Sequence, residues 1–443
     1  MFDPKTVKLD FPVFANHPAR NATHSVAGGP DLVYLDAAAT SLKPRAVIDA
    51  EREYLEQYSA NVGRGLYPLA ETATERFETV REKVATFIGA TSSKEIIFTS
   101  GTTHSINLVA GLLEPLVPSE SNIVVTELEH HSNFLPWKEL ARRKNIEFRV
   151  APASPSLGGP IDMEGRIDAE RLVELIDPHT AIVAFSAVSN VTGGINRVKE
   201  IVAAIKNINP QTIVLVDAAQ AVGHMPLDVS DWNADFIAFS GHKMFGTTGV
   251  GVLYGKSALL ETLHPVTFGG GMVLDIYPPE SAGRVYPPGR GCAAETLYKD
   301  IPHRFEAGTP NIGGVIAFGA ALEYIESIGL ENIRAHEIAL TEYALKRLKE
   351  TFGDTLRIIG PQDAKDRSGI IAFSFEGIHP HDIAHLLGER DICVRAGEHC
   401  AAPLHRTLHL DATTRISFGI YNDGNDVEKL IEVLKKIQEM FSE

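Results

Sequence analysis

Cysteine is scarce in this chain of 443 residues, which contains only Cys292, Cys393 and Cys400. Three thiols cannot build a disulfide framework, and a sparse, odd number is typical of a reducing compartment, so we expect a cytoplasmic protein. Long apolar runs are also lacking, because no window approaches the ~18 apolar residues of a membrane span. The first residues combine acidic side chains with prolines and lack an apolar core, so we expect no signal peptide.

Basic residues are outnumbered, with 41 Lys and Arg against 57 Asp and Glu and a net charge of −16. An acidic chain without a basic stripe lacks the electrostatic footprint of a nucleic-acid-binding protein. The hydrophobic fraction of 44% and the charged fraction of 22% are ordinary for a globular protein. Together, the composition, charge and cysteine content predict a cytosolic enzyme or a large binding protein, with no nucleic acid or membrane as partner.

Short runs rich in Val, Ile and Phe alternate with longer amphipathic segments along the first 260 residues. These runs are apolar at consecutive positions, which is typical of strands covered on both faces. One intervening segment, residues 198–207, repeats apolar residues at helical spacing on one face. The alternation predicts an α/β fold with a mainly parallel sheet and helices on both sides. The expected strands are Glu95–Thr99, Ile123–Thr126, Ile182–Ser186, Ile213–Asp217, Phe236–Ser240 and Val250–Tyr254.

The pattern changes in residues 265–311, which are rich in Gly and Pro and predict a long excursion from the sheet. From Ile312, two long helical stretches precede a second set of short strands and a final helix from Asp423. We therefore expect an N-terminal arm at residues 1–31, a large domain at 32–310 and a smaller C-terminal α+β domain at 311–443. The strands expected in the C-terminal domain are Ile370–Phe375, Ile392–Val394 and Arg415–Phe418.

Two polar motifs follow strand-like runs and suggest cofactor chemistry. Lys243, in the segment SGHKMFG, lies just past a buried strand, where desolvation lowers an amine pKa and favours attack on a carbonyl. An exposed turn lysine is the ordinary alternative. Asp217 ends the preceding strand, where a carboxylate can pair with a protonated pyridine nitrogen or simply cap a helix.

Two further motifs lie at strand ends. TSGTT at residues 99–103 precedes a helical run and can present donors to a phosphate, although any helix cap looks similar. EHHSN at residues 129–133 pairs two histidines, but no third ligand follows at a zinc spacing, so we expect an imidazole of this pair to stack on a cofactor ring and no metal site. Ligands of open α/β sheets bind beyond the carboxyl ends of strands. The four motifs together therefore predict a site for pyridoxal 5′-phosphate (PLP).

With these motifs, the chain resembles the type II (SUF-type) cysteine desulfurases, which are class V aminotransferase-like PLP enzymes of fold type I. The resemblance extends over nearly the whole chain. It implies a large domain with a mainly parallel seven-stranded sheet, an arm packed on the small domain, and a homodimer. It also implies L-cysteine as substrate and a sulfur-acceptor protein in iron–sulfur cluster assembly. Four other segments carry it, namely YLDAAAT at 34–40, RFEAGTPN at 304–311, VRAGEHCAAP at 394–403 and RISFGIYN at 415–422.

The resemblance also implies roles for single residues. Lys243 would form the Schiff base with the cofactor and move the Cα proton, and Cys400 would receive the sulfur as a persulfide. Asp217 would pair with the pyridine nitrogen, and His130 would stack on the ring. The side chains expected to bind the phenolic oxygen are Asn190 and Gln220, and those expected to bind the phosphate are Thr102, Thr103, Ser240 and His242, with Thr309 of the partner subunit. The substrate would be bound by Asn190, Arg395 and Arg415, the last of which clamps its carboxylate.

Cys400 determines the reaction type. Its segment, RAGEHCA, places a thiol beside Gly397 in an accessible polar loop, as a nucleophilic cysteine requires. Cys393 lies within an apolar strand and is expected to be an inert core thiol. No partner can be argued for Cys292.

The chain departs from the family pattern in three places. Gly63-Arg64-Gly65 stands where members commonly read His-Arg-Gly, His104 stands where Glu is common, and the segment Tyr277–Lys299 is longer than expected. These departures leave the PLP site intact but bear on substrate preference. The alternatives are therefore a selenocysteine lyase, another class V PLP lyase or epimerase, or a non-catalytic scaffold of the same fold.

Overall fold

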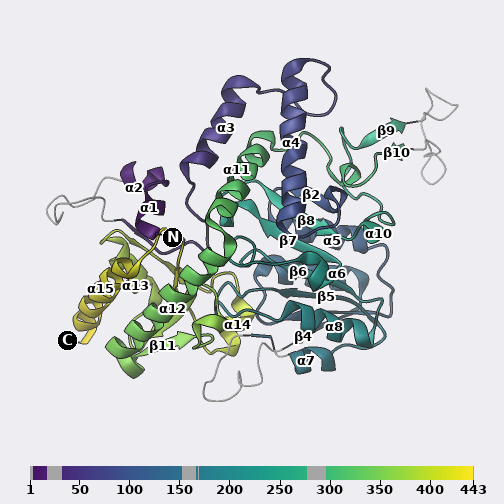
Figure 1. The fold of residues 1–443 in the computed structure, drawn as a ribbon. Coiled ribbons are helices and arrows are strands. Elements are labelled where there is room, and N and C mark those ends of the chain that lie inside the picture. Colours follow the sequence, from purple (N-terminus) through teal and green to yellow (C-terminus); the bar gives the residue numbers. More distant parts are fainter. Residues whose placement is uncertain (1–2, 17–31, 152–165, 168, 277–295, 443) are drawn as a thin grey trace.

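The computed structural model describes residues 3–16, 32–151, 166–167, 169–276 and 296–442. Its centre is a seven-stranded sheet with the strand order β2-β8-β7-β6-β5-β3-β4 (Figure 1). All neighbours are parallel except β8, which runs antiparallel to both β2 and β7, so the predicted mainly parallel sheet is confirmed. The strands are β2 (Ile96–Thr99), β3 (Asn122–Thr126), β4 (Glu147–Ala151), β5 (Thr180–Ser186), β6 (Ile213–Asp217), β7 (Phe236–Ser240) and β8 (Gly251–Gly255).

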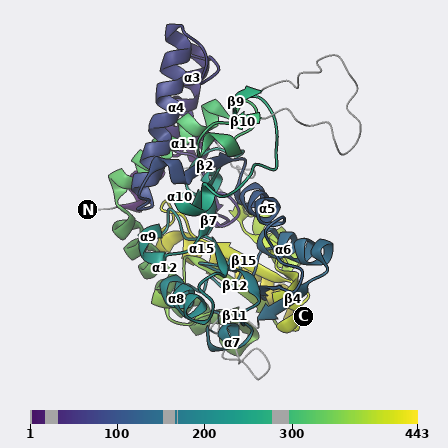
Figure 2. The same cartoon turned by 90° about the vertical axis from the view of Figure 1, so that its right-hand side faces the viewer.

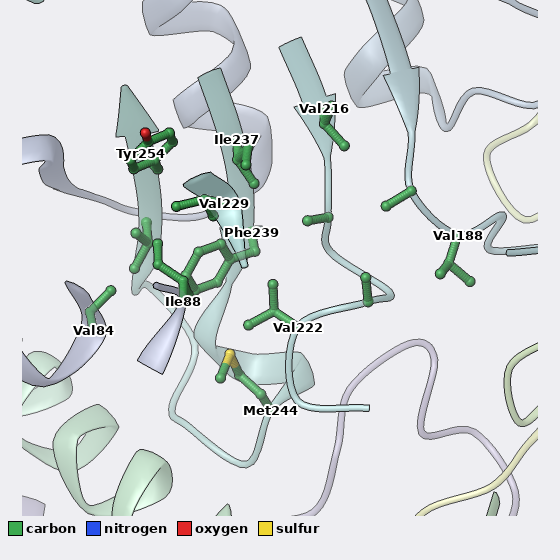
Figure 3. Packing of buried hydrophobic residues seen from close by; sticks show 14 of the residues in the cluster. Val84, Ile88, Val188, Val216, Val222, Val229, Ile237, Phe239, Met244 and Tyr254 are labelled. Carbon is green, nitrogen blue, oxygen red and sulfur yellow. The ribbon is translucent and has the colours of Figure 1, made fainter. Parts of the chain in front are cut away.

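The sheet is covered on both faces because successive strand residues point to opposite sides. In β7, Ile237 and Phe239 belong to one hydrophobic cluster, whereas Phe236 and Ala238 belong to another. Figure 3 shows the first cluster, in which Phe239 lies among side chains from several elements. One face is covered by α4 (Pro68–Phe87), α8 (Val198–Ile208) and α11 (Ile312–Ile328), the other by α5 (Thr102–Leu113), α6 (His131–Lys144) and α10 (Ser257–Leu260). The short helices α7 (Ala169–Glu174) and α9 (Val229–Trp232) flank α8.

The C-terminal part contains a second, antiparallel sheet with the order β11-β12-β15-β14. Its strands are β11 (Leu356–Ile359), β12 (Ile370–Phe375), β14 (Arg395–Gly397) and β15 (Thr413–Ser417). A separate hydrophobic cluster joins this sheet to α12 (Leu330–Phe352), α13 (Pro380–Gly388) and α15 (Gly424–Ser442). Near the start of the chain, β1 (Val33–Tyr34) pairs in parallel with β13 (Ile392–Cys393), which precedes β14. The short helix α14 (Ala402–Thr407) follows β14.

The long helix α11 begins at Ile312, where the second domain is expected to start. It packs against α3 (Arg45–Gln57) and α4, and its buried residues share the hydrophobic cluster of the large sheet. Gly329, with φ 86°, separates α11 from α12. Among the described helices, none alone is long and apolar enough to cross a membrane, and only the pair 312–328 and 330–355, bent by 72°, passes that test jointly.

The described part of the N-terminal arm forms α1 (Pro4–Lys8) and α2 (Pro12–Asn16). Between these helices, Phe11 packs edge-on against Phe245, Tyr324 and Tyr421, which come from three distant parts of the chain. The arm therefore contacts residues from both expected domains.

The Gly- and Pro-rich segment contains a two-stranded hairpin of β9 (Val273–Ile276) and β10 (Thr296–Tyr298). Residues 277–295, which include Cys292 and most of the segment Tyr277–Lys299 that is longer than expected, lie outside the described residues.

Candidate active site

A cavity of about 270 Å³ opens at the carboxyl ends of β5, β6 and β7. Thr309 does not line it, but lines a separate cavity of about 510 Å³ together with Gly63 and Arg64. The first cavity brings together every other site residue expected from the sequence: Thr102, Thr103, His130, Asn190, Asp217, Gln220, Ser240, His242, Lys243, Arg395, Cys400 and Arg415.

Lys243 projects into this cavity from a single 3₁₀ turn (Gly241–Lys243) that follows β7. Burial lowers the pKa of its amine to about 8, although the negative charge of Asp217 opposes that shift. Within the described residues, no hydrogen bond or ion pair occupies the amine. Part of the Lys243 amine is therefore neutral near physiological pH and can act as a nucleophile.

Asp217 is the last residue of β6 and is almost fully buried. Burial raises the pKa of its carboxyl, while the charge of Lys243 and the N–H of Ala219, which donates to Oδ1 over 2.9 Å, lower it. Gln220 follows on the same turn and donates from Nε2 to the carbonyl oxygen of Ala38 over 2.8 Å. The turn after β6 thus presents one carboxylate to the cavity and fixes its neighbouring amide.

The amino end of α5 forms a second wall. The helix is preceded by Gly101, whose φ of 151° suits glycine, and it uses no side-chain cap. The N–H of Thr102 donates to Ser240 Oγ over 2.8 Å, and the hydroxyls of Thr103 and Ser132 lie 2.7 Å apart. The first N–H groups of a helix have no partner within the helix, and together with nearby hydroxyls they can bind anions such as phosphate.

His242 and His130 are both held neutral by burial. The pKa of His242 is lowered to about 4, first by burial and then by Lys243, and its buried Nδ1 has no partner among the described residues. Burial and Lys243 also lower the pKa of His130 to about 3. His130 Nδ1 accepts the N–H of Ser132 over 3.1 Å, so the ring proton lies on Nε2.

Two arginines from neighbouring strands form another wall of the cavity. Arg415 on β15 is nearly buried; its Nη1 donates to the carbonyl oxygen of Asn190 over 2.8 Å, and its Nε has no partner in the described residues. Arg395 on β14 is its cross-strand neighbour. Asp36, which is not among the site residues expected from the sequence, lies 2.9 Å from Arg395 and 3.4 Å from Arg415.

Cys400 lies between β14 and α14, exposed at the mouth of the cavity. Its backbone φ is 57°, and its carbonyl oxygen accepts the N–H of His131 over 2.7 Å. Neither His131 nor the buried His399 beside Cys400 is among the expected site residues. The thiol, the Lys243 amine and the paired arginines therefore share one small space.

A family model described as "Aminotransferase class-V" matches residues 33–430, and the chain belongs to this family. Among curated relatives, it is 43% identical to a "Probable cysteine desulfurase" of Streptomyces coelicolor, with 100% of this chain and 98% of the relative covered. It is 38% identical to a "Cysteine desulfurase" of Haloferax volcanii, with 99% and 98% covered.

Solved structures agree with this relationship. The apo cysteine desulfurase of Thermococcus onnurineus NA1 superposes with a TM-score of 0.83 at 35% identity, covering 99% of this chain and 98% of that one. The cysteine desulfurase CsdA of Escherichia coli superposes with a TM-score of 0.82 at 33% identity over 100% of both chains. The expected fold type I architecture is thereby confirmed.

PLP is the cofactor of this family, and the cavity fits it. Lys243 offers a buried amine, without a partner among the described residues, to an aldehyde, and Asp217 offers a carboxylate to a ring nitrogen. The start of α5 and the orphaned Nδ1 of His242 offer donors to a phosphate. In the described part of the chain, no group of three or more His, Cys, Asp or Glu side chains is placed to hold a metal ion.

Proposed function

We propose that this protein is a PLP-dependent cysteine desulfurase that converts L-cysteine to L-alanine and receives the sulfur on Cys400 as a persulfide. The observation that carries the proposal is the shared cavity, in which the Lys243 amine and the Cys400 thiol face one space of about 270 Å³. The names of relatives at 37–44% identity support the same activity.

We assign substrate binding to the cavity wall formed by Arg395 and Arg415. The Nε of Arg415, which has no partner among the described residues, and the neighbouring guanidinium of Arg395 offer charge-assisted donors to the carboxylate of an amino acid. Asp36 neutralises part of the positive charge of the two arginines. The net charge of +1 that remains on these three side chains matches the single negative charge of the substrate carboxylate. This wall fixes the substrate backbone and leaves its side chain free to face Cys400.

Proton transfer falls to Lys243. When bound, PLP supplies an electron sink that acidifies the substrate Cα–H and weakens its Cβ–S bond. Lys243 Nζ, with a pKa of about 8, is suited to remove the Cα proton and later return a proton, since a base works best near the operating pH. The Asp217 carboxylate, at the end of β6, would pair with the ring nitrogen and keep that nitrogen protonated.

Sulfur transfer falls to Cys400. Its thiolate forms an S–S bond with the substrate sulfur while the Cβ–S bond breaks, and the electron pair of that bond stays on Cβ. Cβ then takes up a proton, so cysteine and the enzyme thiol become alanine and an enzyme persulfide. The exposure of Cys400 at the cavity mouth supports onward transfer to an acceptor protein, for iron–sulfur assembly in the cytoplasm.

The test compares three variants of the PLP-loaded protein supplied with L-cysteine and a thiol reductant. We expect Lys243→Ala to release no alanine and Cys400→Ser to lose most turnover. Cys393→Ser is the matched control, because Cys393 lies half-buried on β13 outside the cavity, and it should turn over normally. Full desulfurase turnover by Cys400→Ser contradicts the assigned nucleophile, and turnover by Lys243→Ala contradicts the whole scheme.

The functional unit in this proposal is a homodimer in which the partner subunit contributes Thr309. Thr309 lines a cavity other than that of Lys243 in the same chain. Helices α3 and α4 extend beyond the sheet (Figure 2), and these helices and the connection between them expose apolar side chains. Leu66, in that connection, is 95% exposed. A second copy covering this surface accounts for both features. The other exposed large apolar residues there are Ile48, Leu55, Tyr67 and Leu69.

Sedimentation equilibrium tests this part of the proposal. We expect a dimer for the natural chain and a monomer, or a much weaker dimer, for Leu66→Asp. A natural chain that sediments as a monomer at micromolar concentration contradicts it.

A further inference from the structure

The backbone that directly follows the Cys400 side chain is bound at two points by one residue, His131, the first residue of α6. The main-chain N–H of His131 donates to the carbonyl oxygen of Cys400 over 2.7 Å. Its ring Nε2 accepts the main-chain N–H of Ala402 over 3.2 Å. Because Nε2 accepts, the ring is neutral and carries its proton on Nδ1.

The segment held in this way has an unfavourable backbone. His399 and Cys400 have φ of 49° and 57°, so two successive residues with side chains occupy the left-handed region. Each such residue costs about 1 kcal/mol and persists only where its surroundings hold it. From the other side, Asn190 Nδ2 donates to the carbonyl oxygen of His399 over 2.7 Å, and His399 Nε2 lies 2.9 Å from Thr413 Oγ1.

We propose that His131 is a positioning residue that holds the Cys400 thiol toward the cavity. This inference rests on the function proposed above. His131 adjoins His130, which lines the cavity, so one turn fixes both a cavity wall and the nucleophile. Displacing a reacting group by 1 Å lowers its rate by up to about 10²-fold. The ring of His131 therefore affects the rate of sulfur transfer through the position of the Cys400 thiol, without touching the substrate.

The experiment compares His131→Leu, which removes the ring acceptor, with His131→Gln, whose amide oxygen can accept the same N–H. His385→Leu is the matched control, since His385 lies exposed on α13. One measurement is hydrogen exchange of peptides that contain Ala402, read by mass spectrometry. The other is steady-state desulfuration of L-cysteine by the PLP-loaded proteins, with kcat and KM determined separately.

For His131→Leu, we expect kcat to fall about 10- to 100-fold with KM nearly unchanged, and exchange at Ala402 to accelerate. His131→Gln should recover most of kcat and of the protection at Ala402, and the control should match the natural chain. The same His131→Leu protein should keep most of its activity on L-selenocysteine, because selenium leaves more readily than sulfur and relies less on the thiol. That result separates a positioning defect from general damage to the site.

Natural kcat and unchanged exchange in His131→Leu overturn the inference, as does a His131→Gln protein that is as slow as His131→Leu. Failure of the proposed function looks different, because then the natural chain itself releases no alanine. In that event the exchange measurement still decides whether the ring of His131 holds the segment.

Discussion

The acidity of Lys243 provides a quantitative test of the cavity. Burial lowers the pKa of its amine from 10.5 to about 8, while the charge of Asp217 opposes the shift. At pH 7, a group with a pKa of about 8 is neutral in ~10% of molecules, against ~0.03% for an ordinary lysine. The neutral amine that nucleophilic attack needs is therefore about 300-fold more populated at pH 7 than in an unburied lysine.

Competitive labelling measures this pKa directly. The cofactor is removed, the protein is treated with a trace of a small acylating reagent between pH 6 and 11, and the peptide that contains Lys243 is quantified by mass spectrometry. The labelling rate should rise tenfold per pH unit up to a midpoint near 8 and then level off. In Asp217→Asn the midpoint should move lower, because the attraction that favours the charged amine is gone.

A midpoint near 10.5 in the natural chain refutes the argument that burial dominates at Lys243. A midpoint that rises in Asp217→Asn refutes the assigned sign of the interaction between the two groups.

Two further predictions concern ion pairs. In Asp36→Asn the nearly buried Arg415 loses its anionic neighbour, so the free energy of unfolding in urea should fall by about 3 kcal/mol; natural stability would contradict the pairing. Burial alone would raise the pKa of Glu306, but Arg81, 2.7 Å away, lowers it to about 2. Because the folded pKa lies below the ordinary 4.5, Glu306 stabilises the fold above that pH by about 3 kcal/mol, and this contribution disappears as pH falls from about 5 to 2. Glu306→Gln should lack this acid-dependent loss in urea titrations at several pH values, and a loss as steep as in the natural chain would contradict it.

The central strands were predictable because a sheet covered on both faces needs consecutive apolar residues. β4 was not among the expected strands, because an edge strand does not need this apolar pattern. It lies at the sheet edge, where Glu147 and Arg149 are accessible and form an ion pair, so its sequence lacks the continuous apolar pattern. A polar edge strand resembles a loop when it is judged by composition alone.

The strand-end residues of the site were predictable because parallel strands bring their carboxyl ends to one edge. Asp36 was not predictable, because its ion-pair partners Arg395 and Arg415 lie 359 and 379 positions away in the sequence. No local sequence pattern predicts such distant pairs. His131 was hidden for a different reason. Its neighbour His130 accounts for the motif, and the role of the second ring depends on a segment folded onto it from residues 399–402.

One measurement tests the central claim most directly. The PLP-loaded protein is incubated with L-cysteine without reductant, alanine is quantified, and the peptide that contains Cys400 is examined by mass spectrometry. We predict that alanine forms and that one additional sulfur is found on Cys400, but not on Cys393. Alanine release with the extra sulfur absent from Cys400, or no alanine at all, would contradict the account.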